Sequence, residues 1–495
     1  MEIKYILNHF YKLRHDLKRT YLLSSNDVNK KYTDCVQHEW MSRIHPVIAM
    51  ALTLFDEPQT LSELKEVFSS FFNMPENEAE DFIKLFLDNA ETFTIDYDGV
   101  SNYLPKNIVI DVAEQFAAPI HYSPEQFAYK ELDFKRERPY FAPFTLVFMV
   151  NNTCATDCVY CYADKSVKAT PIAFERLKTI VKEARELNVT KFAVVGGEVL
   201  LYKQWKELFR LLQENNLGET MISTKVPIDE ETVIALKEFD LRVQISLDAI
   251  NSSRLQQILN VGSTYAEKIR HTIELLEKHQ VTFQVATVLT KYNHCIEDLN
   301  AIYKFLSQFE RLRRWEIRVA FKSLYSRGDF DKFKLSHEDV NQVDVWVKDV
   351  QQKTKMHILW SSSVENKYFK GEKGSRSFQG SRCSANYSNL FILPDGKVSI
   401  CEQLYWNPRF IIGDLTKQSI KEIWNSPEAL RLAFPRREDF RESSVCKTCG
   451  LFDECMDFPN RCIADVLKGY GMDNWDYPDP RCCKAPQFIH NLLSE

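Results

Sequence analysis

The middle of the chain, from about residue 140 to residue 335, alternates short apolar runs with amphipathic stretches. Short runs rich in β-branched and other apolar side chains are typical of buried strands. Six such runs occur, at 145–150, 191–195, 220–223, 241–248, 282–288 and 315–319. Stretches with helical spacing separate them, for example 177–187 and 266–278. Because strands that alternate with helices form parallel β/α units, the pattern predicts an α/β fold, a partial (β/α)6 barrel of the TIM type.

The first 130 residues have a different pattern. A capping-box sequence at Thr60–Glu63 precedes apolar positions with helical spacing over 61–72. A second helix is expected to begin near Pro75, and an alternating strand then runs into a hairpin turn over 93–99. Helix, helix and hairpin is the order of a winged helix. Residues 1–130 are therefore predicted to form a winged-helix-like domain.

Composition narrows the class of protein. The chain has 495 residues, of which 27% are charged and 44% hydrophobic, so two to four globular domains are expected. The net charge is −6 and no long basic run is present, which argues against nucleic acid as the main partner. The N-terminal residues lack an apolar segment and no run of eighteen apolar residues occurs, so we expect a cytoplasmic protein without membrane contact. The 13 cysteines would then stay reduced, which suits metal ligation.

Three cysteines, Cys154, Cys158 and Cys161, lie in the loop expected to leave the first barrel strand. Three closely spaced thiolates could hold three corners of an iron–sulfur cube and leave the fourth iron without a protein ligand. A structural zinc site normally has four ligands, and no fourth Cys or His lies nearby. Two other interpretations remain at this point: a turn without metal, or a zinc ion whose fourth ligand comes from far along the chain.

A second group of eight cysteines lies between residues 383 and 483, after a Ser-, Gly- and Lys-rich connector at 361–382. Cys383 and Cys401 flank a predicted hairpin that turns at Asp395-Gly396, which would bring the two thiols near each other. Taken alone, this group is also compatible with a zinc ribbon or a treble-clef-like zinc site.

The C-x3-C-x-Φ-C spacing of the first group, with Tyr160 before the last cysteine, resembles the signature of radical S-adenosylmethionine (SAM) enzymes. One strand later, Gly196-Gly197-Glu198 resembles the family's GGE motif, which holds the amino group of SAM. The resemblance implies that Tyr160 lies near the adenine and that polar residues at later strand ends contact SAM. These residues are Ser223, Ser246, Asp248, Thr287 and Arg318. Taken singly, each hydroxyl or carboxylate is explained equally well as a polar group that closes a strand, and Arg318 as one partner of a structural ion pair. The alternative role of Tyr160 is that of a core residue.

The second group resembles the SPASM domain, which binds two auxiliary [4Fe–4S] clusters. The family pattern is C-x9–15-G-x4-C, then C-x2-C-x5-C-x3-C, then a last cysteine. It is matched by Cys383, Gly396, Cys401, Cys446, Cys449 and Cys455. Cys462 departs from the pattern, because six residues rather than three separate it from Cys455. The resemblance implies a first auxiliary cluster on Cys383, Cys401 and Cys462, and a second on Cys446, Cys449, Cys455 and either Cys482 or Cys483. A substrate thiolate, or the other cysteine of that last pair, could complete the first cluster.

The resemblance covers residues 140–485 and implies a radical SAM barrel over 140–360, a linker at 361–382 and a SPASM domain over 383–495. It implies an oxidoreductase that reductively cleaves SAM. The resulting 5′-deoxyadenosyl radical would install a thioether or carbon–carbon crosslink in a ribosomally synthesised precursor peptide.

The same resemblance implies two partners: the leader of the precursor peptide, held by the front domain, and an electron donor such as flavodoxin or ferredoxin. A winged helix can also bind DNA or serve only as packing. Two other functions stay open, namely oxidation of a Cys or Ser of a folded protein, as in sulfatase-maturing enzymes, and a non-catalytic metal-binding peptide scaffold. No residue stands out as an acid or base.

Overall fold

The structure is a computed structural model, and its described residues divide into two compact units. The front unit comprises residues 1–142 and 185–190, and the barrel unit comprises residues 143–184 and 191–495. The described residues are 2–24, 37, 40–87, 89–112, 121–218, 221–325, 329–361, 383–457, 461–482 and 484–487. Apart from Ser361, the predicted linker at 361–382 therefore lies outside the described residues.

The front unit contains the predicted helix pair and hairpin. Helix α2 (Leu61–Phe72) begins after Thr60, whose hydroxyl accepts the amide hydrogen of Glu63, while the Glu63 carboxylate accepts that of Thr60. Helix α3 (Glu76–Leu87) and the antiparallel hairpin of β6 (Phe93–Tyr97) and β7 (Val100–Leu104) follow. The other elements are β1 (Lys4–Leu7), β2 (Tyr11–His15), β3 (Thr20–Ser24), β4 (Met41–Ile44), α1 (Pro46–Thr53), β5 (Gln59–Thr60), β8 (Val109–Asp111) and the 3-10 helix η3 (Pro124–Phe127). The winged-helix assignment rests on the order helix, helix and hairpin. Because β1 to β4 and α1 precede that order in the structure, the assignment stays a prediction.

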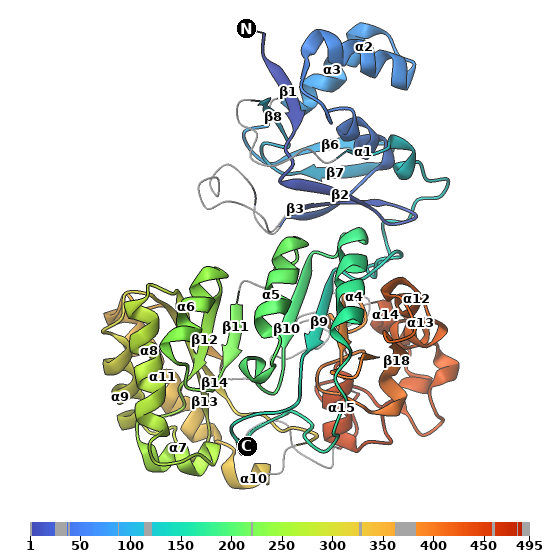
Figure 1. Ribbon diagram of the computed structural model, residues 1–495. Helices are drawn as coiled ribbons and strands as arrows, with labels where there is room; N and C mark the ends of the chain where they lie inside the picture. Colours follow the sequence, from blue (N-terminus) through green and yellow to red (C-terminus); the bar gives the residue numbers. More distant parts are fainter. Residues whose placement is uncertain are drawn as a thin grey trace. The chain divides into compact units, whose positions relative to one another are not determined.

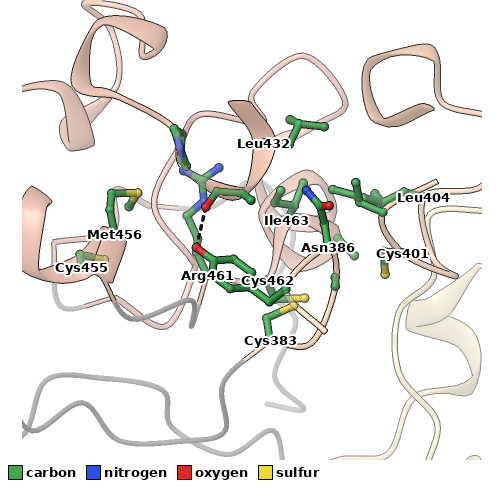
Figure 2. A pocket seen from close by; sticks show the side chains of 16 residues that line it. Cys383, Asn386, Cys401, Leu404, Leu432, Cys455, Met456, Arg461, Cys462 and Ile463 are labelled. Carbon is green, nitrogen blue, oxygen red and sulfur yellow. Dashed lines mark hydrogen bonds between the residues drawn. The ribbon is translucent and has the colours of Figure 1, made fainter. Parts of the chain in front are cut away.

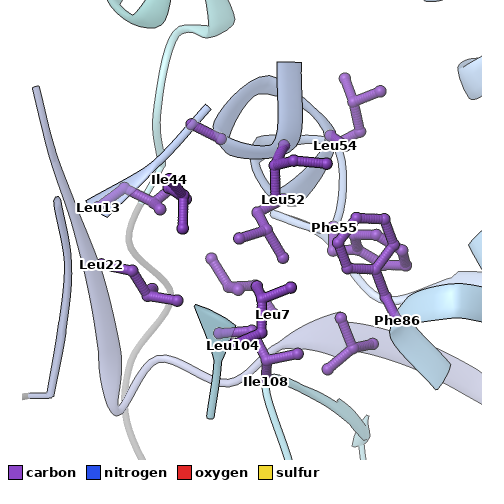
Figure 3. Packing of buried hydrophobic residues seen from close by; sticks show 14 of the residues in the cluster. Leu7, Leu13, Leu22, Ile44, Leu52, Leu54, Phe55, Phe86, Leu104 and Ile108 are labelled. Carbon is purple, nitrogen blue, oxygen red and sulfur yellow. The ribbon is translucent and has the colours of Figure 1, made fainter. Parts of the chain in front are cut away.

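The core of the front unit joins these helices to its strands (Figure 3). Leu7 and Leu22 come from strands, and Leu52 comes from α1. Phe55 meets Phe86 of α3 edge-on, with ring centroids 5.8 Å apart. All five side chains are at most 1% exposed, and fully burying such a side chain contributes about 1.5–3 kcal/mol.

The barrel unit contains all six predicted strands, each within three residues of its predicted ends. They are β9 (Thr145–Met149), β10 (Lys191–Val195), β11 (Met221–Thr224), β12 (Arg242–Ser246), β13 (Phe283–Leu289) and β14 (Leu312–Val319). Helices lie along the outside of these strands (Figure 1). They are α4 (Phe174–Glu186), α5 (Trp205–Glu214), α6 (Glu230–Glu238), α7 (Ser252–Leu259), α8 (Tyr265–Lys278), α9 (Ile296–Leu306) and α11 (His337–Lys353). The predicted α/β partial barrel is confirmed.

The barrel strands form two parallel ladders. Strands β9 and β10 form one, and β11, β12, β13, β14 and β15 (Ile358–Ser361) form the other in that order. Strand β15 was not predicted, because its four residues run directly into the polar connector. Short connections complete the unit: the 3-10 helix η4 (Val199–Leu201) and helix α10 (Phe330–Phe333).

The cysteine-rich region continues the first ladder. Strands β16 (Asn389–Ile392) and β17 (Lys397–Ser399) form the predicted hairpin, with Gly396 at φ +84° in its turn. Strand β16 pairs in parallel with β9, and β17 pairs with β18 (Ile411–Asp414). The remaining elements are α12 (Ile420–Trp424), α13 (Pro427–Ala433), α14 (Phe452–Asp457), α15 (Ile463–Tyr470) and the 3-10 helices η5 (Pro408–Phe410), η6 (Arg437–Asp439) and η7 (Val445–Thr448). The region therefore shares a sheet with the barrel.

This shared sheet is packed as well as hydrogen-bonded. Met149 of β9 lies in one buried cluster with Phe391 and Leu393 of the hairpin and with Tyr405. Figure 1 shows α12 to α15 gathered beside α4 and β9. No helix in the described part of the chain is both long enough and apolar enough to cross a membrane.

Candidate active site

The first three cysteines lie in the cysteine loop (residues 153–162), beyond the C-terminal end of β9. The amides of Asp157 and Val159 in this loop donate to the last two carbonyls of α7, at 2.9 Å each. The loop is therefore fixed at the edge where parallel β/α barrels place their reactive groups.

The three thiols of this loop are held close together by local contacts. The hydroxyl of Thr156 lies 3.4 Å from the sulfur of Cys154 and 3.3 Å from that of Cys158. The amide of Cys161 donates to the carbonyl of Cys158 at 3.0 Å, and no disulfide joins the three. Burial raises the pKa of the Cys158 thiol, and the ammonium of Lys225 opposes that shift.

The GGE turn packs backbone to backbone against the start of the cysteine loop. The amide of Gly197 donates to the carbonyl of Asn151 at 2.8 Å, and the side-chain amide of Asn151 donates to the carbonyl of Glu198 at 2.9 Å. A Cβ on Gly197 would overlap the carbonyl of Thr153, whereas a Cβ on Gly196 would meet the Asn151 carbonyl at 3.3 Å. Only glycine at 197 lets the two loops approach this closely.

The carboxylate of Glu198 is buried where β10 and β11 end. Its side chain accepts the amide hydrogens of Leu200 at 3.2 Å and of Lys225 at 3.1 Å, and the residue is 2% exposed. Burial raises the pKa of Glu198, and the amide donors oppose the shift. The carboxylate is thus fixed by the backbone immediately beside the cysteine loop.

Tyr160, Asp248 and Lys225 form a compact hydrogen-bonded triangle. The phenol of Tyr160 donates to Asp248 at 2.5 Å, and the ammonium of Lys225 donates to both, at 2.8 and 3.2 Å. Asp248 is fully buried and also accepts the amide hydrogen of Val288 at 2.8 Å. Burial lowers the pKa of Lys225, but the Asp248 carboxylate and the thiolates of the cysteine loop raise it on balance. The triangle places a cation against the thiols.

The hydroxyl of Thr287, another predicted SAM contact, forms its hydrogen bonds inside the barrel. Its hydroxyl donates to the carbonyl of Leu247 at 2.7 Å and accepts the indole hydrogen of Trp315 at 2.9 Å. The residue is 0% exposed, so it stabilises the strands around it.

Ser223, Ser246 and Arg318 keep accessible surface at the strand ends. The hydroxyl of Ser223 accepts a hydrogen bond from the side chain of Gln244, and Ser246 closes β12. Arg318 forms an ion pair with Glu316, with nitrogen–oxygen distances of 2.6 and 2.8 Å, and its side chain is 53% exposed. The structural ion pair expected as the alternative role of Arg318 is therefore present.

Cys383, Cys401 and Cys462 come from three separate segments and line one cavity of about 80 Å³, which Cys455 also lines (Figure 2). The hairpin of β16 and β17 brings Cys401 back towards Cys383, and Cys462 immediately precedes α15. Burial raises the pKa of the Cys401 thiol to about 12 and also raises that of Cys462, and negative charge on Cys383 adds to both shifts.

The remaining cysteines form a neighbouring group. Burial raises the pKa of the Cys455 thiol to about 12, with contributions from Cys446, Cys482 and Cys449. Cys446 lies in η7 and Cys455 in α14, so the predicted C-x2-C-x5-C segment folds back on itself. Cys483 lies outside the described residues.

A partly buried carboxylate and two tyrosines lie between the cysteine loop and the cavity. Burial raises the pKa of Glu402, next to Cys401, and the guanidinium of Arg318 opposes that shift. After burial, the pKa of Tyr162 is raised by the charges of Glu402, Cys161 and Cys401, in that order. Burial also raises the pKa of Tyr405, followed by the charge of Tyr162 and then by the same three charges, so both tyrosines lie within electrostatic range of both thiol groups.

Sequence reasoning missed Lys225, Glu402 and Arg461. Lys225 follows the hydroxyls that close β11, and its place at a strand end was a usable signal. Glu402 and Arg461 each adjoin a predicted cysteine ligand, but nothing in the local pattern indicates that either is partly buried.

The donor sets fit iron–sulfur clusters. Thiolates are the usual ligands of such clusters, and the Nη1 atom of Arg461 is buried beside them without a hydrogen-bond partner among the described residues. Across the described chain, no three Cys, His, Asp or Glu side chains converge tightly enough to hold a single metal ion. A cube of four irons spreads its ligands more widely than one ion does, so the looser grouping suits a cluster.

Comparison with protein families gives two matches. Residues 149–306 match the radical SAM superfamily, and residues 383–450 match the SPASM iron–sulfur cluster-binding domain. The first match contains the cysteine loop and the GGE turn, and the second contains Cys383, Cys401, Cys446 and Cys449.

Two relatives differ in how much of their length the chain covers. A GTP 3′,8-cyclase of Desulforamulus reducens is 28% identical over 31% of this chain and 50% of its own length. The PqqA peptide cyclase of Granulibacter bethesdensis is 21% identical over 71% of this chain and 90% of its own length. The chain thus spans half of the first relative and most of the second.

Solved structures show the same fold along almost the whole chain. The crystal structure of Streptococcus suis SuiB bound to S-adenosylmethionine covers 97% of this chain and 100% of its own, with a TM-score of 0.62 and 15% identity. SuiB bound to its precursor peptide SuiA gives a TM-score of 0.63 over 96% of this chain, also at 15% identity. The chain therefore contains a radical SAM domain, which carries the cysteine loop and the GGE turn, and a C-terminal SPASM iron–sulfur cluster-binding domain.

Proposed function

We propose that the protein installs a crosslink, either a thioether or a carbon–carbon bond, in a ribosomally synthesised precursor peptide. The observation that carries the proposal is the pairing of β16 with β9, which puts the SPASM thiols on the sheet that ends in the cysteine loop. Two resemblances support a peptide substrate: PqqA peptide cyclase, matched over 90% of its length, and the fold of SuiB, which binds a precursor peptide.

In this proposal the cysteine loop holds a [4Fe–4S] cluster through Cys154, Cys158 and Cys161. A cluster held there would, with bound SAM and one electron from a donor, supply a 5′-deoxyadenosyl radical able to remove a hydrogen atom from a substrate carbon. Glu198 would hold the amino group of SAM, and its carboxylate is already oriented by the amides of Leu200 and Lys225.

The residues around the cysteine loop exclude water and fix its geometry. The triangle of Tyr160, Asp248 and Lys225 closes the loop from the barrel side, and Lys225 supplies positive charge beside the thiolates. Ser223, Ser246 and Arg318 keep accessible surface at the strand ends and are the polar groups available to a bound cofactor. Fixed polar groups in a closed site need no reorganisation during the reaction.

The SPASM thiols would hold two auxiliary clusters. Cys383, Cys401 and Cys462 line one cavity and form the first set, and the second set is Cys446, Cys449, Cys455 and Cys482 or Cys483. These clusters would accept the electron released as the crosslink forms, and an electron donor such as flavodoxin or ferredoxin would supply the electron that starts the reaction.

The front unit is proposed to bind the leader of the precursor peptide. It contains the helix pair α2 and α3 and the two-stranded hairpin of β6 and β7. A peptide can add as a further strand to an exposed hairpin edge, where main-chain hydrogen bonds provide affinity. The linker at 361–382 would separate the barrel domain of residues 140–360 from the SPASM domain of residues 383–495.

The test is coexpression with a small peptide encoded beside this gene, followed by mass spectrometry of the peptide. We expect a loss of two hydrogens for each crosslink, and no loss with Cys158→Ala, which removes one ligand of the first cluster. An unmodified peptide together with oxidation of a Cys or Ser in a folded protein would support the sulfatase-maturase-like alternative. SAM cleavage by Cys158→Ala at the wild-type rate would refute the cluster assignment.

A further inference from the structure

Arg461 lies between the two groups of SPASM thiols. It lines the cavity of Cys383, Cys401 and Cys462, and its charge also interacts with the Cys446 and Cys455 thiolates (Figure 2). It is one of the six residues that separate Cys455 from Cys462, where the family pattern has three. The place where this chain departs from the pattern therefore contributes a partly buried cation to both groups.

The contacts of Arg461 leave part of its guanidinium uncommitted. Nη2 donates to the carbonyl of Trp475 at 2.8 Å, and the group lies over the rings of Phe440 at 5.1 Å and Trp475 at 6.0 Å. Nη1 is buried and has no hydrogen-bond partner among the described residues. Leaving a charged donor unpaired in a buried site is costly, so a negatively charged partner is expected beside it.

Nearby carboxylates do not account for this atom. Burial lowers the pKa of Arg461 on balance; negative charge on Cys446 and Cys455 opposes that shift most, and Asp476 and Asp479 oppose it less. Asp476 is hydrogen-bonded to Arg441, and Asp479 to Arg481 at 2.7 Å. Each carboxylate is thus occupied by its own arginine, and the cysteine sulfurs are the remaining groups beside Arg461 that can carry negative charge when they bind a cluster.

We propose that Arg461 is a positioning residue that raises the reduction potentials of both auxiliary clusters. An arginine stays protonated at neutral pH, and its fixed positive charge favours the more negative, reduced form of a nearby cluster. Charge and hydrogen bonds to the sulfur atoms are established levers on cluster potential. The inference rests on the proposed function, because it requires clusters at the SPASM thiols.

The effect should be large because the site is buried. The interaction between two unit charges falls only in inverse proportion to their distance, and solvent and salt screen it little in a protein interior. Loss of the Arg461 charge should therefore shift the one-electron reduction equilibrium of the auxiliary clusters about tenfold towards the oxidised form, which is about 59 mV for a one-electron couple.

The experiment is an anaerobic redox titration of the full chain followed by electron paramagnetic resonance, together with iron analysis. Signals that persist when Cys154, Cys158 and Cys161 are all changed to Ala belong to the auxiliary clusters. Arg461→Gln should lower their midpoint potentials by the amount that corresponds to the tenfold shift. Arg461→Lys keeps the charge and should change the one-electron reduction equilibrium by less than about threefold.

Arg437→Gln is the matched control. The guanidinium of Arg437 donates to the carbonyls of Lys447 and Cys449 at 3.1 and 3.0 Å, but its side chain is 34% exposed and lies 3.5 Å from Asp453. Because solvent screens it and a carboxylate neutralises it, its loss should change the equilibrium less than twofold.

Unchanged potentials in Arg461→Gln with full iron content would overturn the inference alone. If Arg461→Gln assembles no clusters, Arg461→Lys decides: near-native potentials support the role of charge, and failed assembly indicates a structural guanidinium instead. Absence of iron from the wild-type chain would overturn the proposed function and this inference with it.

Discussion

The two thiol groups of the barrel unit are assembled in opposite ways. Cys154, Cys158 and Cys161 occupy one short loop, and contacts inside that loop bring their sulfurs together. Cys383, Cys401 and Cys462 come from segments spread over 80 residues and meet only because a hairpin and a helix fold onto the barrel sheet. The first group can therefore be recognised from spacing, whereas the second depends on long-range packing.

The two groups also differ in the cation beside them. Lys225 belongs to a triangle in which Asp248 and Tyr160 share its ammonium. The positive charge of Lys225 is thus paired with a carboxylate inside the protein. The guanidinium of Arg461, beside the SPASM thiols, keeps one buried nitrogen without a hydrogen-bond partner among the described residues. Variants that disturb each arrangement separately test this contrast.

The largest effect is expected for Lys225→Met. Removing the ammonium leaves the buried Asp248 carboxylate without its counter-ion, and breaking a buried pair in this way typically costs about 3–5 kcal/mol. Hydrogen exchange of the cysteine loop and the end of β11 should accelerate accordingly. The double variant Lys225→Met with Asp248→Asn should recover part of the loss, since it removes both charges.

Lys165→Met provides the control for that experiment. Lys165 also lies by the cysteine loop and pairs with Asp157 at 3.2 Å, but the Asp157 side chain is 48% exposed. Exposed pairs contribute about 0–1 kcal/mol, so this variant should stay near wild type. A cost below 1 kcal/mol for Lys225→Met would mean that the triangle is not a balanced buried pair.

Gly197→Ala tests how the cysteine loop is held. The new Cβ would overlap the carbonyl of Thr153, so the loop must move away from the GGE turn. A displacement of about 1 Å in a reactive site can reduce the rate about 100-fold, and we expect that loss in 5′-deoxyadenosine formation. Gly262→Ala, with no atom within 4 Å of its Cβ, should keep the native rate. Equal rates for both variants would show that the close approach is dispensable.

Gly413→Ala is the corresponding test of the SPASM region. A Cβ on Gly413 of β18 would lie 2.5 Å from a side-chain carbon of Ile423 in α12. Side chains repack more readily than backbone, so the expected cost is about 1–3 kcal/mol in the local free energy of unfolding. Hydrogen exchange of β17 and β18 measures it, and Gly450→Ala, whose Cβ has open space, is the control. A wild-type exchange pattern would show that α12 adjusts freely.

The contrast between contacts within one short segment and contacts between distant segments also explains how much of the fold and of the site the sequence could predict. The strands β9 to β14 follow from local apolar runs, and the hairpin turn at Gly396 follows from its Asp-Gly pair. The parallel pairing of β16 with β9 could not be predicted, because it joins residues more than 240 positions apart and leaves no local signal. The SPASM cysteines were recognised by resemblance, but the cavity that four of them line required the fold.

For the residues predicted to contact SAM, position along a strand could be predicted from the sequence, and burial of the side chain could not. Ser223, Ser246 and Arg318 lie within the last two residues of their strands, as predicted, whereas Thr287 lies two residues before the end of β13. Their burial was not predicted: Asp248 and Thr287 are both fully buried and bonded within the chain, while Ser223 is exposed. Alternation of side chains decides which residues face the interior, and a shift of one residue at the end of a strand reverses that assignment.

The smallest effect is expected for Tyr325→Phe, in the segment that packs against residues 404 and 405. The hydroxyl of Tyr325, in the segment after β14, donates to the carbonyl of Leu404 at 3.0 Å, and its ring meets Tyr405 edge-on at 5.2 Å. Tyr325→Phe keeps the ring contact and removes one neutral hydrogen bond, which is worth about 0.5–1.5 kcal/mol. Amides of residues 401–406 should exchange correspondingly faster, whereas Tyr103→Phe, at a side chain 58% exposed on the front unit, should leave them unchanged. Faster exchange that extends to the cysteine loop would mean that the two thiol regions form one cooperative unit; exchange confined to 401–406 would mean that each is stabilised by its own contacts.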